Sequence, residues 1–276
     1  EEFTFKARII FLNASTIASA AILLNSKSPS FPNGLGNSSN QLGHNLMDHF
    51  STSGTVAEYE GFNEFYYSGR NPGGIYIPRF HNLNNESDNT FKRGYALHGK
   101  AQRQHWEDHQ VEGFGKEFKE KLSKPGKWQI WLGAIGETLP YYHNRVELSE
   151  DEKDEWGIPL VKIHFRYGEN ELSLREDSIN EAEKMLEKAG FGNIRSFRSE
   201  LIPGSAIHEM GTARMGKDPK TSVLNAFNQM HDVKNIFITD GSCMTSSATQ
   251  NPSLTYMALT ARACDFAVKQ FKKGLL

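Results

Sequence analysis

Apolar runs near both ends of the chain predict strands that lead into helices. At the start, the run 7–12 (ARIIFL) suits a buried strand, and 16–26, rich in Ala, Ile and Leu, suits a helix. Near the end, 235–239 (NIFIT) reads as a short buried strand followed by an Asp240-Gly241 turn. A strand that feeds a helix is the unit of a doubly wound α/β sheet. The pattern alone fits an ordinary core strand equally well.

A second helix is expected to begin at Asn251. Its side chain suits an N-cap, because the amide oxygen can accept a backbone N–H of the first turn. Pro252 suits the first helical position, where a missing N–H costs nothing. The start of such a helix favours an anion or an electron-rich ring. The apolar side chains that recur along it at roughly helical spacing are Leu254, Met257, Ala258, Ala261, Phe266 and Val268.

Between residues 50 and 202 the pattern changes to short segments, partly aromatic and β-branched, that are separated by polar turns. Such segments predict a sheet. Residues 144–165 read as a hairpin with an acidic tip. A metal site at that tip is conceivable, but a solvated turn is the favoured interpretation. The predicted strands are 51–59, 74–79, 94–102, 128–135, 146–149 and 159–165.

The segment 169–189 predicts an amphipathic helix that lies on this sheet and ends at Gly190. We therefore expect an α+β domain at 50–202, built on an antiparallel sheet flanked by helices. It would be inserted into a doubly wound α/β domain formed by 1–49 and 203–276. The side chains expected to face the sheet are Leu172, Ile179, Ala182, Met185, Leu186 and Ala189.

Composition narrows the class of protein. The net charge is −2 over 276 residues and no basic stripe is evident, which argues against nucleic acid as the main partner. The two cysteines, Cys243 and Cys264, make a disulfide framework unexpected and are too few for a metal cluster. No apolar run approaches the length of a membrane span, and no signal peptide is present. Because the chain begins with Glu, we expect a processed or excised chain.

The most specific motifs lie in three segments. Residues 34–49 read GLGNSSNQLGHNLMDH, residues 207–216 read IHEMGTARMG, and residues 240–262 read DGSCMTSSATQNPSLTYMALTAR. Together they resemble the C-terminal half of the glucose-methanol-choline (GMC) family of FAD-dependent alcohol oxidoreductases. The amino-acid sequence of the last segment resembles the bacterial gluconate and glucoside dehydrogenase flavoproteins more than the fungal oxidases. His44 is a departure, since the family usually has Arg there.

Alcohol oxidation needs a base at the hydroxyl, a hydride acceptor at the carbon and hydrogen bonds to the developing alkoxide. His208 is the candidate base, because imidazole titrates near neutral pH and because its motif matches that of the family's catalytic histidine. Asn251 matches the family's second active-site residue, which is His or Asn. An amide cannot act as a base, so Asn251 is expected to hydrogen-bond the alkoxide. Without the resemblance, a structural histidine and a simple helix cap would be the favoured interpretations.

The resemblance also implies cofactor contacts. Asp240 and Gly241 match a turn beside the ribityl and phosphate part of the flavin, while Pro252 and Ser253 place backbone groups at its pyrimidine edge. Ala14 lies in a turn that reads Asn-Ala-Ser where the family often has Ala-Gly-Ala. Cys243 is expected to be a buried filler without nucleophilic function. Arg214 is equally compatible with binding an anionic group and with ordinary packing.

The family's N-terminal Gly-x-Gly-x-x-Gly unit, which binds the ADP part of FAD, has no counterpart here. Gly34 and Gly36 do not replace it, because Ser39 stands at the third glycine position and no strand directly precedes them. We therefore expect a fragment that needs an upstream FAD-binding segment. The resemblance implies FAD as cofactor, a small sugar or polyol substrate, and a cytochrome or small accessory subunit as a further partner. It is compatible with either side of a bacterial membrane.

Two alternatives remain open at the level of the sequence. One is a catalytically silent carbohydrate-binding or interaction module that is derived from such an enzyme. Retention of both His208 and Asn251 argues against it, because a binding module needs neither a base nor an alkoxide donor. The other is an oxidase or lyase of the same superfamily. The leading hypothesis is FAD-dependent oxidation of a secondary alcohol of a sugar, glycoside or sugar acid.

Overall fold

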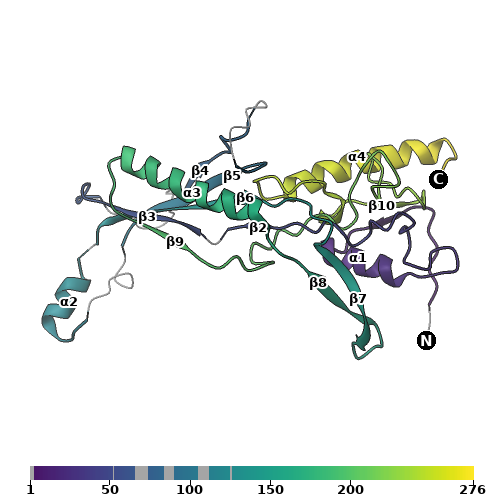
Figure 1. Ribbon diagram of the computed structural model, residues 1–276, viewed down its shortest axis with the longest axis horizontal. Coiled ribbons are helices and arrows are strands. Elements are labelled where there is room, and N and C mark those ends of the chain that lie inside the picture. The colour runs from purple at the N-terminus through teal and green to yellow at the C-terminus, as the bar shows by residue number, and fades with distance from the viewer. Residues whose placement is uncertain (1–2, 52, 66–73, 84–89, 105–111, 125) are drawn as a thin grey trace. The chain divides into compact units, whose positions relative to one another are not determined.

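The computed structural model describes residues 3–51, 53–65, 74–83, 90–104, 112–124 and 126–276. The chain forms two compact units, whose elements are labelled in Figure 1. Unit 1 comprises residues 1–49, 137–167 and 203–276, and unit 2 comprises residues 50–136 and 168–202. The mixture of helices and sheets agrees with the expected α/β character. The doubly wound arrangement of the complete cofactor domain stays a prediction.

Unit 1 contains a parallel pair of strands, β1 (Ile10–Leu12) and β10 (Ile236–Ile238). Helix α1 (Thr16–Asn25) follows β1, so the expected strand–helix unit is confirmed. The strand was expected to begin at residue 7 and to be buried, which is wrong. Pairing with β10 covers only three residues, and Ile10 is exposed. All three residues of β10, in contrast, are buried.

Helix α4 (Ser253–Lys272) follows the 3-10 turn η2 (Gly241–Cys243) and a loop. The expected helix is confirmed, but the apolar residues at helical spacing do not form its buried face: Leu254 is 76% exposed and Met257 is 68% exposed. Its fully buried positions are Ala263 and Ala267, which pack against Phe237 of β10. Small side chains allow the helix to approach the strand closely, and this preference was not visible in the hydrophobic spacing.

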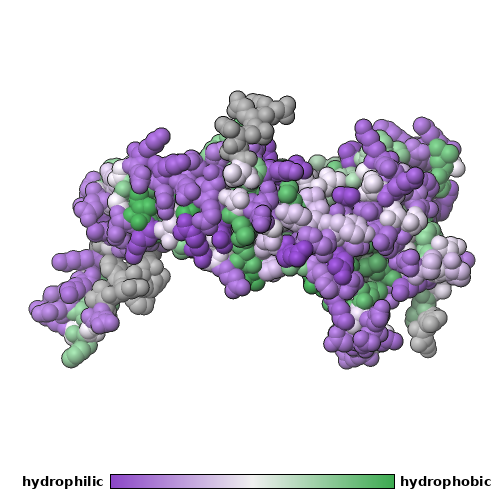
Figure 2. Space-filling model, in the orientation of Figure 1, coloured by the Kyte–Doolittle hydropathy of each residue, from purple (hydrophilic) through white to green (hydrophobic). Residues whose placement is uncertain are grey.

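The predicted hairpin is confirmed as β7 (Arg145–Lys153) and β8 (Pro159–His164), which pair in antiparallel register. Its base packs against α1. The acidic tip is a solvated turn: residues 150–153 are exposed, and Figure 2 shows the tip as hydrophilic. The Asp154 carboxylate accepts two backbone N–H groups of the turn, from Trp156 and Ile158, each at 2.9 Å.

Unit 2 is built around an antiparallel sheet, as expected. Neighbouring strands in the order β4-β5-β6-β3-β9 are all antiparallel, and β2 pairs with β6. Strand β9 was not predicted, because its sequence alternates too weakly. The bounds are β2 His49–Phe50, β3 Ser53–Tyr59, β4 Gly74–Ile77, β5 Tyr95–Arg103, β6 Trp128–Glu137 and β9 Gly192–Arg198.

Helix α3 (Glu169–Lys188) lies against β3, β5 and β9, as Figure 1 shows. Its buried stripe includes Leu174, whereas Leu172 and Ala189 are exposed, so those two assignments are wrong. At 100° per residue the buried positions fill an arc of about 140° around Ala182, with Leu174 at one edge. Leu172 lies just outside the opposite edge of that arc, and contact with the sheet decides where the arc ends. A further short helix, α2 (Lys116–Leu122), has no buried residue.

Two of the four boundaries between the units, at 49/50 and 202/203, lie at the expected limits of the 50–202 domain. Residues 137–167, which we expected within the 50–202 domain, instead belong to unit 1. The reason is that the hairpin packs on α1 of unit 1. Assignment of the two units to cofactor and substrate stays a prediction. Among the described helices, none is both long and apolar enough to cross a membrane.

One cluster in unit 2 brings His81, Asp177 and Glu181 within 4.8 Å of one another. Each group has a protein partner: Tyr95 donates to Asp177 at 2.6 Å, and His81 lies 3.4 Å from the same carboxylate. Glu181 pairs with Lys184 at 2.7 Å. These partners favour an ion-pair network over a metal site, and the expectation that the protein needs no metal remains a prediction.

Candidate active site

The backbone around His208 is fixed by a buried carboxylate. Oδ1 of Asp48 accepts the backbone N–H of His49 at 2.7 Å and that of His208 at 3.1 Å, so one oxygen joins two segments 160 residues apart in sequence. Asp48 is only 1% exposed. Burial raises the pKa of Asp48, and the hydrogen bonds from the two backbone donors oppose this shift.

The His208 ring has a polar neighbour at each nitrogen. Nδ1 lies 3.0 Å from Nδ1 of His49, and Nε2 lies 3.0 Å from Nδ2 of Asn251. The fold therefore brings together the two residues that the sequence nominated as base and alkoxide donor, which are 43 positions apart. A ring nitrogen with a lone pair and an amide N–H group converge at this point.

Asn251 does not cap helix α4, so this expectation is wrong. Pro252 occupies the N-cap position, and no side chain caps the first turn. The Asn251 side chain is directed to His208 instead. Because a helix cannot satisfy its first N–H groups internally, those of Ser253, Leu254 and Thr255 have no intrahelical acceptor. This end of α4 can donate to an electron-rich group.

A pocket of about 360 Å³ lies beside this pair. It is lined by Asn13, Ser15, Thr16, Ile207, His208, Glu209, Asp240, Gly241, Pro252, Ser253 and Tyr256. Four of the five residues predicted to contact the cofactor are therefore in one pocket with the candidate base. Ala14 is not part of the lining, although both of its sequence neighbours are.

The turn at Ala14 is held from within the protein. The backbone N–H of Ala14 donates to Oγ of Ser19 at 3.0 Å, and that hydroxyl donates to Asp240 at 2.5 Å. Ser15 has φ 80°, in the left-handed region that favours glycine, which makes this turn unusual for a serine. The other oxygen of Asp240 accepts the N–H of Ser242 at 2.9 Å. The Asp240 carboxylate thus joins α1 to η2, and both of its oxygens accept hydrogen bonds from within the protein.

Gly241 lies where no side chain fits. A Cβ atom built on it would contact Oγ1 of Thr16, would approach the backbone oxygen of Glu209 to 2.6 Å and would come within 3.0 Å of the Tyr256 hydroxyl. Thr16 is itself fixed, because its hydroxyl donates to the Glu209 oxygen at 2.6 Å. The backbone at Gly241 therefore lies so close to Thr16 and Glu209 that this position of the pocket wall requires glycine.

Among the residues of this site that were not predicted from the sequence are Asp48, His49, Thr16 and Tyr256. The first two were quoted within the GHNLMDH segment but were given no role. Burial raises the pKa of Tyr256 and keeps its hydroxyl neutral, so it can donate a hydrogen bond into the pocket. Tyr256 lies one turn after Pro252 on α4, and that spacing was the available signal.

Two further expectations concern Cys243 and Arg214. Cys243 is fully buried, and burial raises the pKa of its thiol to about 12, which agrees with the role of an inert filler. Arg214 donates from Nε to the backbone oxygen of Thr221 at 3.1 Å and from Nη2 to Gln41 at 3.3 Å. These contacts support the packing role over the anion-binding role.

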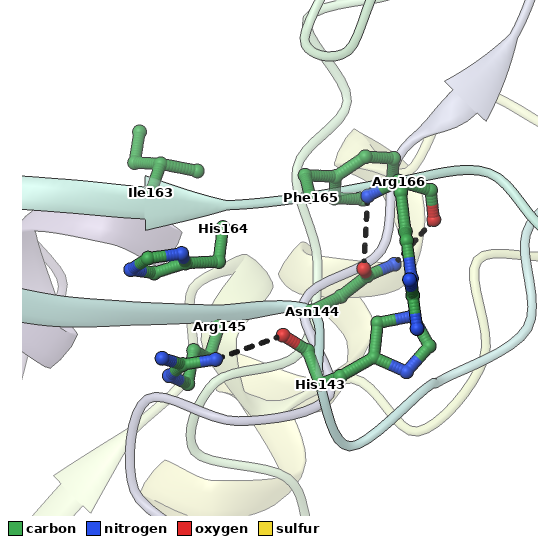
Figure 3. A pocket seen from close by; sticks show the side chains of 7 residues that line it. All are labelled: His143, Asn144, Arg145, Ile163, His164, Phe165 and Arg166. Carbon is green, nitrogen blue, oxygen red and sulfur yellow. Dashed lines mark hydrogen bonds between the residues drawn. The ribbon is translucent and has the colours of Figure 1, made fainter.

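A separate pocket of about 420 Å³ lies at the base of the β7–β8 hairpin (Figure 3). Asn144 and Arg166 join its two sides through paired hydrogen bonds of 3.1 and 3.0 Å, drawn in Figure 3. Two of its basic side chains, Arg145 and His164, are both engaged by Glu147, at 2.9 and 2.6 Å. It shares no lining residue with the His208 pocket, and its charge is partly compensated.

Comparison with known proteins shows that the chain is similar to dehydrogenases. At 29% identity, the chain is similar to 2-methyl-1,2-propanediol dehydrogenase from Mycolicibacterium austroafricanum, over 96% of this chain and 48% of that protein. At 27% identity, it is similar to the fructose dehydrogenase large subunit from Gluconobacter japonicus, over 97% of this chain and 48% of that protein. The chain thus spans about half the length of these relatives.

The fold is shared with a formate oxidase from Aspergillus oryzae RIB40. The TM-score is 0.62 at 16% identity, and the match covers 99% of this chain and 56% of that one. The relatives are named as dehydrogenases, and the protein that shares the fold is named as an oxidase. The particular family is the one described as GMC oxidoreductase, whose model matches residues 140–260, and this part of the chain belongs to it. The family resemblance seen in the sequence motifs is therefore confirmed.

Proposed function

We propose that this chain is the catalytic C-terminal part of an FAD-dependent dehydrogenase that oxidises a secondary alcohol of a sugar, glycoside or sugar acid. The observation that carries the proposal is the convergence of His208 and Asn251 at 3.0 Å beside the pocket at the start of α4. Nε2 of His208 can accept a proton, and Nδ2 of Asn251 can only donate a hydrogen bond.

The two groups fit the proton chemistry of alcohol oxidation. A substrate hydroxyl oxygen placed about 2.8 Å from both atoms would donate its proton to Nε2 of His208 and accept from Nδ2 of Asn251. As the O–H bond breaks, the new N–H bond forms at Nε2, and the amide donor stabilises the charge that develops on oxygen. Both groups act on the same oxygen, so their effects reinforce each other.

The pocket fits the flavin end of FAD. Its volume of about 360 Å³ is at the low end for small-molecule sites and suits part of a ring system better than a whole dinucleotide. The uncapped N–H groups of Ser253 and Leu254 suit an edge rich in carbonyl and nitrogen acceptors. When bound, the flavin would supply the hydride acceptor. Asp240 and Gly241 would shape the wall, and Ala14 would act only through the turn that contains it.

The substrate class follows from the relatives that match nearly the whole chain, which are named for a diol and for a sugar. Their names also include a large subunit, which supports an assembly with a further protein such as a cytochrome or a small accessory subunit. We accordingly propose electron transfer to a protein or quinone acceptor. The upstream segment that would bind the ADP part of FAD is a further component of this proposal.

The test is anaerobic reduction of bound flavin by candidate polyols and sugars in the full-length protein, followed at the flavin absorption band. His208→Ala is expected to slow this step about 10²–10⁴-fold, because it removes the proton acceptor. The exposed His164, on β8, provides a matched control, and His164→Ala is expected to retain the wild-type rate. The flavin content of both variants after gel filtration shows whether the cofactor site is intact.

A loss of less than tenfold in His208→Ala would remove His208 from the proposed role. Sugar binding to a protein that never retains flavin, even with the upstream segment present, would favour the carbohydrate-binding module instead. Rapid reoxidation of the reduced flavin by oxygen would favour an oxidase over a dehydrogenase.

A further inference from the structure

His49 contacts the candidate base at Nδ1, whereas Asn251 contacts it at Nε2. The Nδ1 atoms of His49 and His208 are 3.0 Å apart. Two neutral imidazole nitrogens can make a hydrogen bond only if one carries hydrogen and the other is bare. The remaining contacts of the two rings decide which is which.

The second ring nitrogen of His49 identifies the donor. Its Nε2 lies 3.2 Å from the backbone oxygen of Ser247 and 3.1 Å from that of Ala248. Carbonyl oxygens only accept hydrogen bonds, so Nε2 of His49 must carry hydrogen. The ring is buried, and burial lowers the pKa of His49, which favours the neutral form. In that form Nδ1 of His49 is bare and is an acceptor.

The hydrogen between the two rings therefore belongs to His208. With hydrogen on Nδ1, neutral His208 has a bare Nε2, which is the atom that faces the amide of Asn251 at 3.0 Å. This is the tautomer that a base at Nε2 requires. Histidine in water prefers the opposite tautomer, so the protein has to impose this one, and the hydrogen bond made by the other nitrogen is the usual means.

We propose that His49 is a positioning residue that holds His208 in the tautomer with a bare Nε2, ready to accept the substrate proton. The inference rests on the proposed function of His208 and adds a residue to it. His49 does not touch the substrate oxygen. It acts through the Nδ1–H of His208, and the proton taken from the alcohol stays at Nε2 while that hydrogen bond is kept.

The position of His49 is over-determined by its surroundings. Asp48 accepts its backbone N–H at 2.7 Å, and the hydroxyl of Tyr167 donates to its backbone oxygen at 3.1 Å. The titratable groups that face it are Asp48 on its own segment, His208, and Glu137 at the end of β6. The neutral ring of His49 fixes the tautomer of His208 without placing a carboxylate charge beside it. In an Asp–His pair, by contrast, the acceptor is a charged carboxylate.

The test compares two substitutions of His49 in the full-length protein. Asn can place its Oδ1 where Nδ1 of His49 lies and accept the same hydrogen bond, whereas Leu fills similar volume and cannot accept. His49→Leu is expected to lower kcat for alcohol oxidation about 10–100-fold with little change in KM, and His49→Asn less than about tenfold. His44→Leu, at a half-buried histidine stacked on Tyr142, is the matched control and is expected to keep the wild-type kcat.

A second readout does not depend on activity. Long-range ¹H–¹⁵N correlation spectra of ¹⁵N-histidine-labelled protein report which ring nitrogen carries hydrogen, and His208→Gln identifies the signal. We expect a bare Nε2 in the wild type and in His49→Asn, and a mixture of tautomers in His49→Leu. Equal flavin content and melting temperature in the Leu and Asn variants separate this effect from unfolding.

Three results would overturn the proposal: a hydrogen on Nε2 of His208 in the wild type, a wild-type kcat in His49→Leu, or equal impairment by Leu and Asn. Failure of the underlying function has a different signature, because His208→Gln would then retain the rate of flavin reduction whatever happens at His49.

Discussion

At the scale of single residues, each neighbour of His208 controls a different property of the ring. His49 faces Nδ1 and Asn251 faces Nε2, at 3.0 Å in both cases. The sequence nominated His208 and Asn251 and gave the Asn251 side chain two roles, a helix cap and a hydrogen-bond donor to the alkoxide. Their contact gives that amide a different partner, and it leaves the first turn of α4 open.

Asn251 is predicted to contribute through its N–H group. In the full-length protein, Asn251→Ala should slow flavin reduction by alcohol about 10²–10³-fold, as expected when a donor to a developing oxyanion is removed. Stopped-flow reduction at saturating substrate measures this. The exposed neighbour Gln250 is the control, and Gln250→Ala should keep the wild-type rate. If Asn251→Ala raises only KM and leaves the rate of flavin reduction unchanged, the amide binds the alcohol in the ground state and does not stabilise the alkoxide.

At the scale of elements, the pocket depends on how closely η2 approaches the start of α1 and the loop before Met210. The Asp240 carboxylate holds this arrangement through Ser19 and Ser242. The hydroxyl of Thr16 adds a hydrogen bond to the oxygen of Glu209. The walls of the pocket therefore come from three stretches that are distant in the sequence and are joined by short polar contacts.

Gly241→Ala is predicted to disturb both stability and cofactor retention. The added methyl group would lie 2.6 Å from the oxygen of Glu209, so the backbone must shift, at a cost of about 1–3 kcal/mol. Urea unfolding measures the cost, and flavin content after gel filtration measures the effect on the pocket. Gly192→Ala on β9 is the control, because nothing lies within 4 Å of its added Cβ. Equal midpoints for the two variants would contradict the close approach at Gly241.

At the scale of the whole molecule, the buried His49 and the half-buried His44 of unit 1 link stability to pH. Burial lowers the pKa of His44 and of His49 from 6.5, while hydrogen bonds to backbone carbonyls partly oppose the shift. Both histidines resist protonation more in the folded than in the unfolded state. The stability that they contribute is therefore complete above pH 6.5 and is lost as the pH falls through their lowered folded pKa values. The contribution of Asp48 to the pH dependence of stability has the opposite sign, because its raised pKa adds stability at low pH that is lost as the pH rises.

Thermal unfolding followed by circular dichroism from about pH 8 to about pH 5 should accordingly show a midpoint that falls below pH 6.5, because the unfolded chain binds protons at His44 and His49 more readily than the folded chain does. The double variant His44→Gln/His49→Asn should flatten the curve in this range. A double variant that keeps the wild-type slope would show that the two histidines are not its source.

Much of the fold could be predicted because its signals are local. The hairpin at 144–165, the helix at 169–188 and the strand-to-helix unit at 10–25 follow from alternation, helical period and turn residues. The buried faces of α3 and α4 could not be predicted as well. Several stripes of each helix are compatible with burial, and the partner surface chooses among them. Leu174 over Leu172 is one such choice, and Ala263 over Leu254 is another.

The sequence by itself determined the chemistry that is available: an imidazole at 208, an amide at 251, a glycine at 241 and the motifs that assign residues 140–260 to the GMC oxidoreductase family. Only the tertiary structure decided how these groups meet. The ring of His208 contacts His49 and Asn251, and its backbone N–H donates to Asp48. These contacts link positions 43 to 160 residues apart. Contacts of that range depend on packing and leave no periodicity in the sequence. Consequently, the tautomer of the base, the open first turn of α4 and the role of His49 became visible only in three dimensions.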